Sequence, residues 1–176
     1  MRLFVAVALP DEIARSLGML QNGVPGARWQ TRDQLHLTLR FIGEVDGQDA
    51  GVVDDALTTI AAPTFPAELK GVGAFGGKHP RALWAGVATS EALHHLHSKI
   101  ESALHRVGME GDGRKYTPHV TLAKLKGTQY GHVIDFLTDH ALYASVPFTV
   151  ANFILYSSQL TANGSIYRVE KSYRLG

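Results

Sequence analysis

Two stretches of the sequence share the order histidine, any residue, threonine, leucine. The first is HLTL, which begins at His36, and the second is HVTL, which begins at His119. Imidazole titrates near neutral pH, so two such side chains can serve one reaction, one as proton acceptor and the other as proton donor. Chance predicts roughly 0.07 matches to this motif in a chain of this composition. Two matches therefore indicate a shared role rather than two unrelated surface positions.

The apolar residues around the first motif predict a β-strand with one polar face. Side chains alternate between the two faces of a strand. The polar face of this strand carries His36, Thr38 and Arg40. Its opposite face carries Leu35, Leu37, Leu39 and Phe41. We expect the apolar face to pack on helices and the polar face to line a groove.

The second motif repeats this pattern on another predicted strand. His119 and Thr121 share the polar face, while Val120 and Leu122 point inward. Lys124 falls on the core side of a regular strand. It therefore reaches the polar face only if the strand ends or bulges before it.

Two histidines on opposite walls of a groove suit an in-line displacement at phosphorus. One ring takes a proton from the attacking oxygen, and the other gives a proton to the leaving oxygen. The hydroxyls of Thr38 and Thr121 can donate to the non-bridging phosphate oxygens. Arg40 and Lys124 are candidate cations for holding the anion, although Arg40 can equally be a charge at the rim. Proton transfer and fixed donors require no metal and no other cofactor.

The elements that carry these motifs repeat along the chain. The first half predicts, in order, strand 2–9, helix 11–22, strand 35–42 and helix 47–61. The second half predicts strand 81–88, helix 90–107, strand 118–125 and helix 128–141, while 65–75 forms a connecting strand. We therefore predict an α+β fold that is bilobal and pseudo-duplicated. Two mostly antiparallel sheets face each other across a central groove, with helices on the outer faces.

Length, charge and cysteine content limit the remaining possibilities. A chain of 176 residues, 45% of them hydrophobic, is expected to form a single domain, 1–176, made of two pseudo-symmetric lobes. A net charge of +1 is too small for a long nucleic-acid clamp, and the absence of cysteine excludes disulfides and thiolate metal sites. The opening MRLFVAVALPDE predicts a strand rather than a signal peptide, and no apolar run is long enough to span a bilayer. We expect a cytoplasmic monomer.

The paired motifs resemble those of the two-histidine (2H) phosphoesterase superfamily. HLTLRFIGE and PHVTLAK look like its repeated H-x-T-L motifs. The opening RLFVAVALPDEI, the central PRALWAGV and the closing FILYSSQLTANGSIYRV are similar to segments of one branch. That branch comprises the RNA 2',3'-cyclic phosphodiesterases, also called 2'-5' RNA ligases (LigT/ThpR-like). The similarity extends over essentially the whole chain.

The resemblance implies hydrolysis of RNA 2',3'-cyclic phosphate ends to 2'-phosphate ends, with a reversible 2'-5' joining of such ends. It implies that His36 is the general acid on the departing 3'-oxygen and that His119 is the general base on water. Thr38 and Thr121 would bind the phosphate of an RNA end or nucleotide. Arginine is common in this family where this chain has Lys124, and lysine would bind phosphate as a point charge rather than as a two-pronged fork.

Two other functions remain compatible with these residues. One is a non-catalytic nucleotide- or RNA-binding module on the same fold, and the other is a cyclic phosphodiesterase acting on a small nucleotide such as ADP-ribose cyclic phosphate. A binding module does not require two titrating groups, so two intact motifs favour an enzyme. The catalytic residues contact only the phosphate, so they cannot distinguish RNA from a small nucleotide.

Other chemical signals in the chain favour structural interpretations. GVGAFG at 71–76 matches the dinucleotide-binding pattern, but a strand and not a helix is predicted to follow it. HHLH at 94–97 flanks the apolar stripe of its predicted helix, which is typical of a solvated face. Four aromatic residues are candidates for stacking on a terminal base: Trp29, Phe41, Tyr116 and Trp84. For Trp84, inside an apolar strand, we favour core packing.

Overall fold

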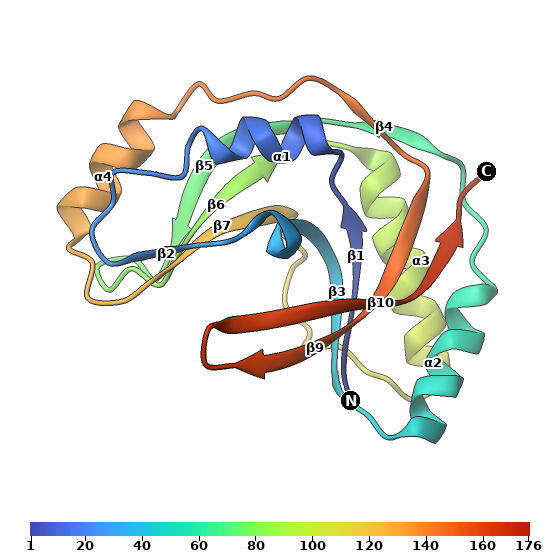
Figure 1. The fold of residues 1–176 in the computed structure, drawn as a ribbon. Coiled ribbons are helices and arrows are strands. Elements are labelled where there is room, and N and C mark those ends of the chain that lie inside the picture. Colours follow the sequence, from blue (N-terminus) through green and yellow to red (C-terminus); the bar gives the residue numbers. More distant parts are fainter.

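A computed structural model describes all 176 residues, which form four α-helices and ten β-strands (Figure 1). The helices are α1 (Asp11–Gly18), α2 (Gly47–Thr58), α3 (Glu91–Arg106) and α4 (Tyr130–Asp139). All four were predicted, and each is a few residues shorter than the sequence indicates. None of them is long and apolar enough to cross a membrane.

Eight of the strands form two four-stranded antiparallel sheets. The first has the order β10-β9-β1-β3 and contains β1 (Arg2–Ala8), β3 (His36–Glu44), β9 (Asn152–Thr161) and β10 (Gly164–Arg174). The second has the order β2-β7-β6-β5 and contains β2 (Ala27–Trp29), β5 (Leu69–Phe75), β6 (Ala82–Val87) and β7 (His119–Leu125). The predicted α+β fold with mostly antiparallel sheets is confirmed, and each motif strand lies in a different sheet.

The connecting segment 65–75 differs from its prediction as one strand. It divides into β4 (Phe65–Ala67), which pairs with β8 (Phe148–Val150) in a separate two-stranded sheet, and β5, which pairs with β6. The partner of β4 is remote in the sequence, whereas β5 pairs with the next strand along the chain, and the apolar pattern of 65–75 does not reveal where the chain changes partner.

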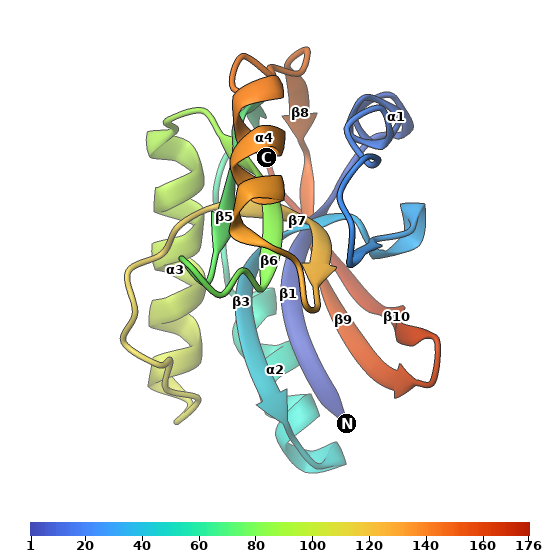
Figure 2. The same cartoon turned by 90° about the vertical axis from the view of Figure 1, so that its left-hand side faces the viewer.

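Helices cover the outer faces of the two sheets. The helix α3 packs against β3 and α2, α2 reaches β10, and α4 contacts β5. Figures 1 and 2 show α2 and α3 together on one side of the molecule, with α4 at the opposite end and α1 along the top. The hairpin of β9 and β10 projects below β2 and β7 in Figure 1, which brings a long ribbon close to the second motif strand.

One hydrophobic cluster of 36 buried residues joins these layers. It includes side chains from both motif strands, such as Leu37 of β3 and Val120 of β7, each 0% exposed. Full burial of each such side chain contributes roughly 1.5–3 kcal/mol. The apolar faces of the motif strands are therefore fixed in a common core, which holds their polar faces in a constant relation.

Helix α3, which runs behind the first motif strand, begins where the sequence predicts. The Ser90 hydroxyl accepts a hydrogen bond from the Leu93 backbone N–H at 3.1 Å. This N-cap satisfies one of the free donors of the first turn. Four residues of its predicted apolar stripe are buried, namely Leu93, Leu96, Ile100 and Leu104, together with Ala103, whereas Val107 at the end of the predicted stripe is exposed. The capping and the stripe together fix which face of α3 lies against β3.

Candidate active site

His36 begins β3 and lies among aromatic rings. Its ring centroid is 4.9 Å from that of Phe4 and 5.2 Å from that of Tyr167, which it meets edge-on. Its Nδ1 lies 2.8 Å from the carbonyl oxygen of Gln34. A carbonyl oxygen only accepts, so Nδ1 must donate, and Nε2 is the nitrogen left to exchange a proton.

His119 begins β7 with a matching arrangement. Its Nδ1 lies 2.7 Å from the carbonyl oxygen of Thr117, again two residues earlier in the chain. The same argument assigns the proton to Nδ1 and leaves Nε2 free. Gly86 of β6 pairs with His119, and Phe75 meets its ring edge-on at 5.0 Å. Both imidazoles are thus fixed by a backbone carbonyl and by packing, without using their reactive nitrogen.

A groove of about 380 Å³ lies between the two sheets and brings the two motifs together. Four sequence-predicted residues line it in matching pairs: His36 with His119, and Thr38 with Thr121. Each threonine lies two residues after its histidine on the same strand face. The groove therefore presents two proton-transfer groups and two hydroxyl donors to one ligand.

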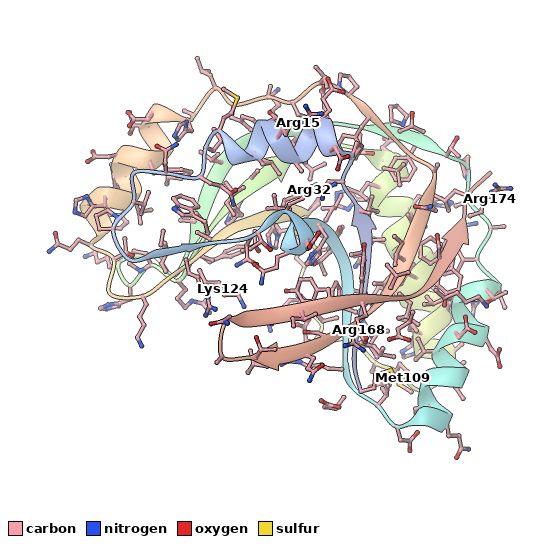
Figure 3. All side chains as sticks on the ribbon, viewed as in Figure 1. Arg15, Arg32, Met109, Lys124, Arg168 and Arg174 are labelled. Atoms are coloured by element: carbon pink, nitrogen blue, oxygen red, sulfur yellow. The ribbon has the colours of Figure 1, made fainter.

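Lys124 also lines the groove, because β7 contains a bulge. Thr121 pairs with Trp84 and Ala123 pairs with Leu83, so the residue between them on β7 has no partner. An extra residue in one strand shifts the alternation of faces beyond it. The sequence predicted Lys124 on the polar face only if the strand ended or bulged before it, and the bulge is present. Figure 3 shows the Lys124 side chain beside the hairpin of β9 and β10.

The predicted placement of Arg40 on the groove face is wrong. In β3, Thr38 pairs with Ala6 and Arg40 pairs with Val5, so Leu39 is the extra residue of a bulge. Val5 is 0% exposed on the core side of β1. Directly paired residues lie on the same face of a sheet, so Arg40 also points inward. Only 6% of Arg40 is exposed, and it does not line the groove.

The buried guanidinium of Arg40 has other partners. Its Nη2 donates to the Met109 carbonyl oxygen at 2.6 Å, and its Nε lies 2.9 Å from Oε1 of Glu101 as an ion pair without an aligned hydrogen bond. Phe41 takes the groove position instead, 70% exposed and matching Lys124 of the second motif. Of the two motif cations predicted to line the groove, only Lys124 does so, and the matching position of the first motif presents an aromatic ring.

The two histidines have different surroundings. Burial lowers the pKa of His36 from 6.5 to about 4, and the charge of the nearby His119 lowers it further, against the opposing effect of the Gln34 carbonyl. The His36 ring is therefore neutral in the free protein at neutral pH. A bound phosphate anion favours the charged ring and so raises the pKa of His36.

Several groove residues carried no signal in the sequence, because they lie outside both motifs, either just before the first one or on strands β1, β9 and β10. The polar ones are Arg2, Gln30, Gln34, Ser158, Ser165 and Tyr167. The side-chain amide of Gln34 donates to the Ser165 carbonyl oxygen at 2.9 Å and so ties the hairpin of β9 and β10 to the first motif. Only the fold places these side chains in the groove, and the resemblance of the closing segment was the one available hint.

Of the four aromatic candidates for base stacking, only Phe41 lines the groove. Trp84 was predicted to lie in the core, yet it lies half-buried on the groove side of its sheet, paired with Thr121. A Cβ at Gly73 would lie 2.1 Å from the Trp84 ring, so this ring packs flat on a glycine of the neighbouring strand. Tyr116 lies behind β3, where its hydroxyl donates to the Thr38 carbonyl oxygen at 2.9 Å.

Known proteins are similar to this chain in both sequence and fold. A sequence profile of the 2'-5' RNA ligase superfamily matches residues 9–161. Proteins named RNA 2',3'-cyclic phosphodiesterase from Thermotoga maritima and Archaeoglobus fulgidus are each 30% identical to it, over 96% of this chain and 92% and 97% of those proteins. The crystal structure of E. coli LigT complexed with 3'-AMP has a TM-score of 0.82 at 25% identity, covering 99% of this chain and 97% of that one.

Proposed function

Because the chain belongs to the 2'-5' RNA ligase superfamily, we propose that it hydrolyses the 2',3'-cyclic phosphate at an RNA end to a 2'-phosphate. The observation that carries this proposal is the pair His36 and His119 in one groove, each with Nδ1 engaged and Nε2 free. Relatives named RNA 2',3'-cyclic phosphodiesterase support the choice of substrate. The similarity to LigT complexed with 3'-AMP supports a nucleotide as the group that the groove accepts.

The reaction uses the two imidazoles on opposite sides of phosphorus. His119 Nε2 takes a proton from water as the water oxygen forms a bond to phosphorus. The bond from phosphorus to the 3'-oxygen breaks, and His36 Nε2 gives its proton to that oxygen. The product carries a 2'-phosphate and a 3'-hydroxyl. His36 ends neutral and His119 ends protonated, so proton exchange with water restores the pair.

The remaining groove residues bind the phosphate. The hydroxyls of Thr38 and Thr121 donate to the two non-bridging oxygens, and the Lys124 ammonium offsets their charge. The bound anion also favours the protonated ring that His36 needs as a donor. Arg40 has no part in this scheme, since its guanidinium binds Glu101 and the Met109 carbonyl.

The same pair can catalyse ligation. If the 5'-hydroxyl of a second RNA replaces water as the attacking oxygen, the 3'-oxygen again leaves and a 2'-5' linkage remains. His119 takes the proton of the 5'-hydroxyl and His36 protonates the 3'-oxygen, so no additional group is required. One chain, taken as a single domain, supplies every residue of the scheme, so the proposed mechanism requires no second subunit.

A product assay with a panel of substrates tests the proposed function. The panel contains an RNA oligonucleotide ending in a 2',3'-cyclic phosphate, an all-3'-5' oligonucleotide ending in a hydroxyl, and ADP-ribose 1'',2''-cyclic phosphate. We expect the first to yield a 2'-phosphate end, with the same rate after EDTA treatment, and the second to remain intact. Binding of the first without product at any pH would instead indicate a non-catalytic module. Turnover of the third alone would assign the chain to small nucleotides.

A further inference from the structure

The segment Gly108–Pro118 connects α3 to the second motif without forming a helix or strand. Such connections are ordinarily the most mobile parts of a fold. This one is held at both ends by residues of β3 and α3, and it leads directly into His119. The contacts that hold it therefore bear on the second catalytic ring.

The early part of this segment is held by the ion pair of the buried Arg40 with the partly exposed Glu101. Arg40 Nη2 donates to the Met109 carbonyl oxygen at 2.6 Å, just after the end of α3. Gly111 then passes close over the pair, since a Cβ there would lie 3.0 Å from Glu101 Oε2 and 3.3 Å from Arg40 Nη2. The position that was expected to bind phosphate thus serves to hold the backbone that precedes the second motif.

The late part of the segment is held by Tyr116. Its hydroxyl donates to the Thr38 carbonyl oxygen at 2.9 Å, and its ring stacks on His97 of α3 at 3.9 Å with planes 3° apart. Strand β3 is at the edge of its sheet, so its outward carbonyls lack a strand partner on that side. Burial raises the pKa of Tyr116, which keeps its hydroxyl protonated as a donor.

The residue after Tyr116 contacts the catalytic ring. The Thr117 carbonyl oxygen accepts from Nδ1 of His119 at 2.7 Å, and this bond fixes the tautomer that leaves Nε2 free. A continuous path therefore runs from the Thr38 backbone, through the Tyr116 hydroxyl and the Thr117 carbonyl, to the imidazole of His119. Its first residue belongs to the first motif and its last to the second.

We propose that Tyr116 is a positioning residue, whose hydroxyl bond to Thr38 sets the orientation and tautomer of His119. This inference rests on the proposed function for its kinetic consequences, but the state of the His119 ring is independent of any substrate. Without the bond, the Thr117 carbonyl loses its fixed place and the His119 ring is free to turn or change tautomer. Substrate binding through the threonine hydroxyls and Lys124 is retained, while proton transfer is slowed.

Tyr116→Phe tests this inference, because phenylalanine keeps the stack on His97 and removes only the hydroxyl. Tyr143→Phe is the matched control, since it removes another partly buried tyrosine hydroxyl, which meets Ser16 Oγ at 2.9 Å away from the groove. We expect Tyr116→Phe to lower kcat about 10- to 100-fold with little change in KM, as misplacement of a catalytic group does. The control is expected to keep the kcat and KM of the wild type.

Nitrogen NMR of the His119 ring supplies the second readout. In the wild type and in Tyr143→Phe, we expect the shifts of a fixed tautomer with the proton on Nδ1. In Tyr116→Phe we expect averaged shifts. Unchanged His119 shifts together with an unchanged kcat in Tyr116→Phe would overturn the inference. A wild type that turns over no cyclic phosphate would refute the proposed function, and the ring shifts would still decide the role of Tyr116.

Discussion

Replacing His36 with glutamine tests whether the groove holds a partly buried, neutral imidazole. Burial lowers the pKa of this ring in the folded protein to about 4, whereas its ordinary value is 6.5. Between these two values the unfolded chain binds the proton and the folded chain does not. The free energy of unfolding therefore falls as the pH falls through this range. Glutamine does not titrate, so the variant lacks this contribution.

The magnitude follows from the two pKa values. At about pH 7.5 the ring is neutral in both states, and its titration contributes almost nothing. At about pH 4.5 the difference between a pKa of 6.5 and one of about 4 lowers the free energy of unfolding by about 2–3 kcal/mol. The bond from Nδ1 to the Gln34 carbonyl is absent from the variant at both pH values, so its loss cancels when the two pH values are compared.

Urea unfolding of wild type and His36→Gln at both pH values gives the required difference. Every other titrating group is present in both proteins, so their contributions cancel as well. We expect the wild type to lose about 2–3 kcal/mol more than the variant between about pH 7.5 and pH 4.5. Equal losses in the two proteins would refute the reasoning, because they would mean that His36 titrates alike in the folded and unfolded states.

Two further substitutions test the phosphate contact of Lys124 and the packing of Trp84 on Gly73. Lys124→Met should lower kcat/KM about tenfold, since it removes the one cation of the second motif that lines the groove. Lys126→Met is the control, because Lys126 is exposed and does not line the groove, and it should leave kcat/KM unchanged. Equal kinetics for both variants would contradict a phosphate contact. Gly73→Ala should lower the free energy of unfolding by about 1–3 kcal/mol, because its Cβ would lie 2.1 Å from the Trp84 ring. The control Gly131→Ala, in open space on α4, should raise the free energy of unfolding by up to about 1 kcal/mol. An unchanged free energy of unfolding in Gly73→Ala would show that the Trp84 ring is not packed on Gly73.

The sequence predicted the parts of the site that depend on local alternation. His36 and Thr38, and likewise His119 and Thr121, are two residues apart before any bulge, so period-2 reasoning places each pair correctly. Beyond the bulge at Leu39 of β3, the same period-2 reasoning fails for Arg40. Its direction depends on how β3 pairs with β1, and β1 comes from the start of the chain. No pattern within one strand encodes its register with another.

Helix α4 shows the same limit for a helical pattern. Ile134 is 41% exposed, while Phe136 is 4% exposed. Apolar residues occur here at four positions within five residues, so the 3.6-residue period fits more than one buried face. The sheet that α4 packs on decides between them. The groove residues Arg2 and Tyr167 were missed for a related reason, since only the assembled first sheet brings them to the motifs.

The central claim is that His36 and His119 transfer protons to and from one phosphate. The most direct test is the single-turnover rate of cleavage of an RNA oligonucleotide ending in a 2',3'-cyclic phosphate. It is measured at saturating enzyme for wild type, His36→Ala and His119→Ala, with binding of the oligonucleotide measured separately. The account predicts that each variant binds the oligonucleotide but loses a factor of about 10² to 10⁴ in rate. Cleavage at the wild-type rate by either variant would contradict it.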